Sequence, residues 1–69
     1  MNNWKSLVET LLALYRQDSY SLTLCNNLCH QVEAKGLTDQ ITKRVEDLQE
    51  KYSLRDSLIL ACKEYNIVS

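Results

Sequence analysis

Apolar residues recur at helical spacing along most of the chain. Between residues 3 and 17 they follow intervals of three and four, so that one helix face carries Trp4, Leu7, Val8, Leu11, Leu14 and Tyr15. Residues 21–35 carry a wider apolar arc, and residues 38–52 carry a narrow stripe among charged positions. Residues 54–65 are the most apolar stretch. The pattern predicts four short helices, over residues 3–17, 21–35, 38–52 and 54–65.

Residues that favour helix ends separate the predicted helices. Side chains that cap helix N-termini occur at Asn2 or Asn3, in the run Asp18–Ser21, at Thr38 and at Ser53. Gly36 is the only glycine, and we expect it in the left-handed conformation that ends a helix. In that arrangement Leu37 packs back on Val32. Because Ser53 follows the third predicted helix directly, we expect almost no loop before the fourth.

The composition supports a single all-α domain spanning residues 1–69. The chain has no proline and one glycine, so few positions favour tight turns. We predict a compact bundle of four short helices, with a three-helix core around a central helix 54–65 as the variant. A chain of this length buries only about 60% of its unfolded surface. Its stability therefore depends on close packing or on association.

The helix predicted over residues 54–65 has more apolar positions than one buried face requires. Ile59 lies about a third of a turn from the main stripe, and Leu60 lies nearly opposite it. With other apolar residues, these form the candidate interaction residues: Leu12, Ile59, Leu60, Ile67 and Val68. Because exposed apolar patches usually mark contacts, we expect the chain to bind a protein partner or to self-associate as a homodimer. A monomer whose last helix is buried on all sides is the other interpretation.

The sequence lacks the residue patterns that catalysis or metal binding requires. Cys25 and Cys29 share a helix face, but His30 points about 100° away from Cys29, and Cys62 belongs to another helix. One glycine leaves no phosphate-binding loop. We therefore expect no enzymatic activity, metal, cofactor or small-molecule substrate, and three buried, reduced thiols. The sequence shows neither a secretory segment nor a membrane span, which predicts a cytoplasmic protein.

One stretch resembles a known motif. Residues 36–48, GLTDQITKRVEDL, are similar to the turn and recognition helix of helix-turn-helix DNA-binding domains. The resemblance implies that DNA would be contacted by Thr38, Gln40, Thr42, Lys43 and Arg44. A net charge of −1 provides no basic footprint for DNA. DNA binding is therefore the alternative to the main prediction, which is a small regulator, inhibitor or adaptor that binds a larger protein, as many phage and mobile-element proteins do.

Overall fold

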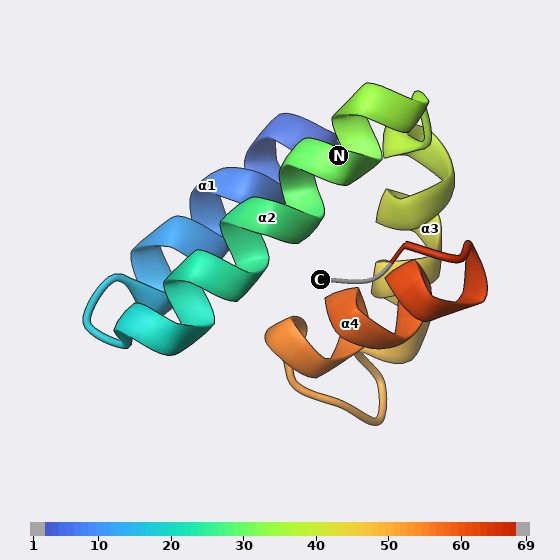
Figure 1. The fold of residues 1–69 in the computed structure, drawn as a ribbon. Coiled ribbons are helices and arrows are strands. Elements are labelled where there is room, and N and C mark those ends of the chain that lie inside the picture. Colours follow the sequence, from blue (N-terminus) through green and yellow to red (C-terminus); the bar gives the residue numbers. More distant parts are fainter. Residues whose placement is uncertain (1–2, 68–69) are drawn as a thin grey trace.

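The computed structural model describes residues 3–67 and confirms an all-α bundle. Its four helices are α1 (Trp4–Tyr15), α2 (Ser19–Lys35), α3 (Thr38–Leu48) and α4 (Leu54–Glu64), with no strand in the described part of the chain. The helices α1 and α2 lie side by side as one antiparallel pair, and α3 and α4 form a second pair beside it (Figure 1). None of these helices has the length and apolarity that crossing a membrane requires.

The core lies between the two helical pairs. Both pairs contribute to it, and its buried apolar side chains are those of Leu7, Leu11, Cys25, Leu28, Cys29, Val32, Ile41, Val45, Leu54, Leu58, Ala61, Cys62 and Ile67. All of them except Ile67 belong to the helical segments whose spacing predicted a buried face. The helix α4 packs against α2 and α3 and exposes Lys63 on its outer side. The four-helix arrangement of the main prediction therefore describes the fold.

Three of the four helices begin at a side chain that caps the first turn. The side chains of Asn3, Asp18 and Ser53 accept hydrogen bonds from the backbone N–H three residues on, as expected for N-cap residues. The prediction that Thr38 caps α3 is wrong. The carbonyl of Leu37 already accepts from the Ile41 N–H at 2.9 Å, so Leu37 occupies the N-cap position and Thr38 begins the helix.

The end of α2 has the predicted geometry. Gly36 adopts φ 69°, its N–H donates to the Glu33 carbonyl at 3.2 Å, and the Leu37 N–H donates to the Val32 carbonyl at 3.1 Å. These are the two hydrogen bonds of a Schellman motif. Leu37 packs against the core that contains Val32, which supplies the hydrophobic part of the motif.

The end of α4 repeats this motif with asparagine in place of glycine. Asn66 adopts φ 60°, its N–H donates to the Lys63 carbonyl at 3.1 Å, and the Ile67 N–H donates to the Cys62 carbonyl at 2.8 Å. Asparagine is the residue other than glycine that most often takes this position. The turn reverses the chain and directs Ile67 into the core.

The connection between α3 and α4 is longer than expected. The helix α3 ends at Leu48, four residues before the predicted end, and residues 49–52 form turns in which the N–H groups of Lys51 and Tyr52 both donate to the Leu48 carbonyl at 3.0 Å. Ser53 then takes an extended conformation to cap α4. The chain needs these residues to reverse direction, and the side chain of Tyr52 is consequently exposed.

Replacing Gly36 by alanine is expected to lower the free energy of unfolding by about 1 kcal/mol, because a Cβ is disfavoured at positive φ. A Cβ at this position would meet no atom within 4 Å, so the cost comes from the backbone alone. Urea denaturation followed by circular dichroism measures the change. Asn66 takes the same position at the end of α4. Asn66→Gly is therefore expected to retain or slightly raise the free energy of unfolding, because glycine accepts a positive φ without strain. An unchanged Gly36→Ala protein would contradict the assigned backbone strain.

Candidate functional site

The five predicted interaction residues do not form one exposed patch. Leu12 is 36% exposed, whereas Ile59 and Leu60 are half-buried at the sides of α4. Ile67 is 1% exposed and belongs to the core, because the turn at Asn66 folds it back beneath α4. It is therefore not a surface residue of this fold. Val68 lies outside the described residues.

Other large apolar side chains are more exposed than the predicted ones. Leu14 is 62% exposed on α1, and three tyrosines, Tyr20, Tyr52 and Tyr65, are exposed outside the core. The helical spacing predicts Leu14 on the buried face of α1, together with Leu7 and Leu11. The second helical pair covers only part of that face, so Leu14 at the far end of α1 remains open to solvent.

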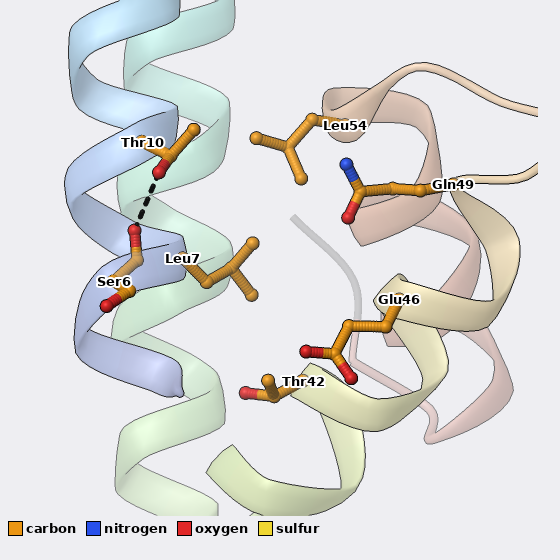
Figure 2. A pocket seen from close by; sticks show the side chains of 7 residues that line it. All are labelled: Ser6, Leu7, Thr10, Thr42, Glu46, Gln49 and Leu54. Carbon is orange, nitrogen blue, oxygen red and sulfur yellow. Dashed lines mark hydrogen bonds between the residues drawn. The ribbon is translucent and has the colours of Figure 1, made fainter. Parts of the chain in front are cut away.

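A cleft opens between α1 and α3, and Figure 2 shows the side chains that line it. Its volume is about 100 Å³, and it is lined by Ser6, Leu7 and Thr10 of α1, Thr42 and Glu46 of α3, Gln49 just after α3, and Leu54 at the start of α4. Leu7 and Leu54 point into the space from opposite sides (Figure 2). We call this feature the α1–α3 cleft.

The polar side chains of the cleft have defined roles. The Thr10 hydroxyl donates to the Ser6 carbonyl at 2.8 Å, and the Thr42 hydroxyl donates to the Thr38 carbonyl at 2.7 Å. Glu46 and Gln49 are exposed, and both side chains are directed toward the cleft (Figure 2). The cleft therefore combines an apolar floor with oxygen atoms around its edge.

Leu14 does not line the cleft, but it follows the cleft residues of α1 on the same side of that helix. It lies four residues after Thr10 and seven after Leu7, which are the spacings of one side of a helix. Leu12 lies two residues earlier and therefore about 200° around the helix, on a different side. We call the cleft together with Leu14 the cleft face. None of its members was among the predicted protein-interaction residues.

The residues that the helix-turn-helix resemblance would place on DNA are divided by the fold. Gln40 and Lys43 are exposed, whereas Thr42 is only 6% exposed and lines the cleft. The Arg44 Nε donates to Glu64 Oε1 of α4 at 2.8 Å, and Thr38 is half-buried at the start of α3. The outer side of α3 also carries exposed carboxylates. The segment thus presents few free cations to a phosphate backbone.

The three cysteines are all free and buried. Burial raises the pKa of all three thiols, that of Cys29 to about 12 and that of Cys62 to about 11, and neighbouring thiols add to both of these shifts. A thiol is a nucleophile or a metal ligand only as the thiolate, so these pKa values disfavour both roles. In the described part of the chain, no group of three or more His, Cys, Asp or Glu side chains is arranged to hold a metal ion.

A polar network around Arg55 joins the α1–α2 turn to the start of α4. Arg55 Nη1 donates to the Ser21 hydroxyl at 2.7 Å, and that hydroxyl donates to Asp18 Oδ2 at 2.8 Å. The Arg55 backbone N–H donates to the Tyr15 hydroxyl at 3.3 Å. Ser21 is fully buried, so its hydroxyl needs both partners. This network is structural, because it satisfies a buried group and positions α4.

We expect Asp18 to make stability depend on acid pH. Hydrogen bonds from the Ser21 backbone N–H and hydroxyl hold the pKa of Asp18 below its ordinary value of 3.8. A lowered pKa gives a contribution that is present above the unfolded value and lost as pH falls through the folded value. Asp18→Asn removes the charge and keeps one acceptor oxygen for the Ser21 backbone N–H, while its NH2 group cannot accept from the Ser21 hydroxyl. The unfolding free energy of the wild type should therefore exceed that of Asp18→Asn at neutral pH, and the difference should shrink as pH falls below about 4.

A difference between the two proteins that stays constant from neutral to acid pH would contradict this role of Asp18. Comparing the two chains removes the contribution of the other carboxylates, which is common to both.

No protein-family model, no curated protein and no solved structure matches the chain.

Proposed function

We propose that this chain is a small helical protein-binding module, and that it acts as a regulator or adaptor by binding a partner protein through the cleft face. The observation that carries the proposal is the α1–α3 cleft, whose apolar floor is made by Leu7 and Leu54, together with the exposed Leu14, which follows Leu7 on the same side of α1 by helical spacing. An exposed leucine on the same helix side as a concave site is a typical anchor point for a protein partner.

The size of the cleft favours a protein partner over a small molecule. Pockets for small-molecule ligands usually measure about 300–1,000 Å³. A volume of about 100 Å³ accommodates the end of one side chain rather than a whole ligand. The remaining affinity would then come from contacts around the cleft, such as those with Leu14, and these require the larger surface of a protein.

The proposal is tested by selecting binders from a random-peptide display library on the wild-type protein. Selected peptides are titrated into isotopically labelled protein, and the amide shifts of the protein locate their site. We expect shifts to gather on residues of α1 and α3 that border the cleft. Leu14→Ser should weaken the selected peptides about tenfold or more, because burying a leucine contributes about 1.5–3 kcal/mol.

Leu12→Ser is the matched control, because it makes the same change on the same helix but on another side. It should alter affinity by less than about twofold. Binders that lose affinity on Leu12→Ser and retain it on Leu14→Ser would overturn the cleft face in favour of the interface predicted from the sequence. Sedimentation of the wild type addresses self-association, since a stable dimer broken by Leu14→Ser would make the partner a second copy of the chain.

A further inference from the structure

The α1–α3 cleft is rich in hydrogen-bond acceptors. Thr10 and Thr42 each have one hydroxyl hydrogen, and both hydrogens are given to backbone carbonyls. Each hydroxyl oxygen therefore has only lone pairs left for an incoming group. The Gln49 amide supplies a further acceptor oxygen. At Thr10 and Thr42 an incoming group must therefore bring the hydrogen, whereas the Ser6 hydroxyl and the Gln49 amide can also donate.

Glu46 adds a negative charge that the described fold leaves without a counterion. It is exposed at the edge of the cleft, and its carboxylate points into the space between α1 and α3 (Figure 2). The ion pairs between described residues join Arg44 to Glu64 and Arg55 to Asp56, so neither involves Glu46. The lining residues include no lysine, arginine or histidine. The charge and the acceptors together complement a cationic donor.

The apolar floor restricts what kind of cation fits. Leu7 is 8% and Leu54 is 7% exposed, and both project into the cleft beside the oxygens. A hydrated metal ion gains nothing from such a floor. The side chains of lysine and arginine do, because their aliphatic stems lie on apolar surface while the charged end reaches polar partners.

We propose that the α1–α3 cleft receives a lysine or arginine side chain of the protein partner, with its stem against Leu7 and Leu54 and its cation at Glu46. The neighbouring residue of the partner on the Leu14 side is then apolar. This inference rests on the proposed function and adds the chemistry of the partner segment, a basic residue next to an apolar one. Free amines lack the neighbouring apolar residue and should bind far more weakly.

The test uses the same random-peptide library, now with the sequences of the binders as the readout. Peptides selected on the wild type should be enriched in lysine or arginine beside an apolar residue. Replacing the basic residue by norleucine should weaken each peptide about tenfold or more, as expected for the loss of a charge-assisted hydrogen bond. In the protein, Glu46→Gln should weaken the binding of the unmodified peptides to a similar extent. Added salt should reduce the binding of these peptides to the wild type.

Asp47→Asn is the matched control for Glu46→Gln. It removes the same charge from the next residue of α3, which does not line the cleft, and should alter affinity by less than about twofold. Both variants change exposed residues, and unchanged circular dichroism confirms that they fold. n-Butylammonium alone serves as the free-amine probe, and binding as tight as that of the peptides would overturn a protein side chain as the occupant.

The outcomes separate this inference from the proposed function. Peptides that shift the cleft residues and depend on Leu14, but carry no basic residue and ignore Glu46→Gln, would overturn the inference and leave the binding module standing. Peptides that bind elsewhere on the protein would overturn both. If basic peptides are selected but Asp47→Asn weakens their binding as much as Glu46→Gln does, the cation is attracted by a diffuse acidic surface. That result would overturn the cleft as the cation site.

Discussion

Replacing Ile67 by alanine is expected to lower the free energy of unfolding by about 3 kcal/mol, as is typical for truncating a fully buried isoleucine. Ile67 is 1% exposed, and its backbone N–H is fixed to the Cys62 carbonyl at 2.8 Å. This hydrogen bond holds the Ile67 backbone against the end of α4, and truncating the buried side chain leaves a cavity in the core. In a domain of this size the loss is a large fraction of the total stability.

Urea denaturation measures this loss, and Ile59→Ala provides the matched control. Ile59 is the same residue type but only half-buried, so its truncation should cost clearly less. The experiment also decides between two roles for the end of the chain. If Ile67→Ala left stability unchanged and weakened an association instead, Ile67 would belong to an interface, as the sequence suggested, and not to the core.

The helices could be predicted from sequence because their signals are local. Spacings of three and four residues reveal a buried face, and Gly36 marks a helix end because few other residues accept a positive φ. The end of α4 has the same geometry, but Asn66 is a weaker signal than glycine, because asparagine also occurs in many other settings. The burial of Ile67 follows from that turn, which explains why the sequence placed this residue on the surface.

The start of α3 shows a second reason why sequence signals can fail. Threonine is a good N-cap residue, and the position of Thr38 after a helix-ending glycine made it a reasonable choice. The Schellman motif at Gly36 sets the path of the chain first, and it places Leu37 at the start of α3. The geometry of one helix end therefore overrides the capping preference at the start of the next.

The cleft face could not be predicted, because it depends on how helices that are distant in sequence come together. Thr10 and Thr42 look like ordinary polar residues on separate helices, and nothing local brings them to one cleft. The exposure of Leu12 and Leu14 also depends on how distant helices pack. The helical pattern placed Leu14 on the core side and Leu12 at its edge, but the length of α1 that the second pair covers decides which is exposed.

At pH 8, the native thiols are expected to react with iodoacetamide far more slowly than ordinary cysteines. Only the thiolate reacts, and desolvation by burial raises the pKa of Cys29 to about 12 and that of Cys62 to about 11, from an ordinary 9.0. Each pKa unit is a factor of ten in the thiolate fraction, so the differences of 12 − 9.0 and 11 − 9.0 lower the thiolate fractions of the two residues by about 1,000-fold and about 100-fold. Burial of the sulfur atoms slows the two reactions further.

Mass spectrometry of the alkylated protein over time measures these rates, and unfolding in urea should restore the rate of an ordinary thiol. Fast labelling of one cysteine in the native protein would contradict its place in the core.

The same raised pKa values make stability depend on alkaline pH. Because the folded thiols keep their protons longer, their contribution is complete below about pH 9 and is lost as pH rises through the folded values of about 11 and 12. The unfolding free energy should therefore fall steadily above about pH 9, and conversion of all three cysteines to alanine should reduce that slope.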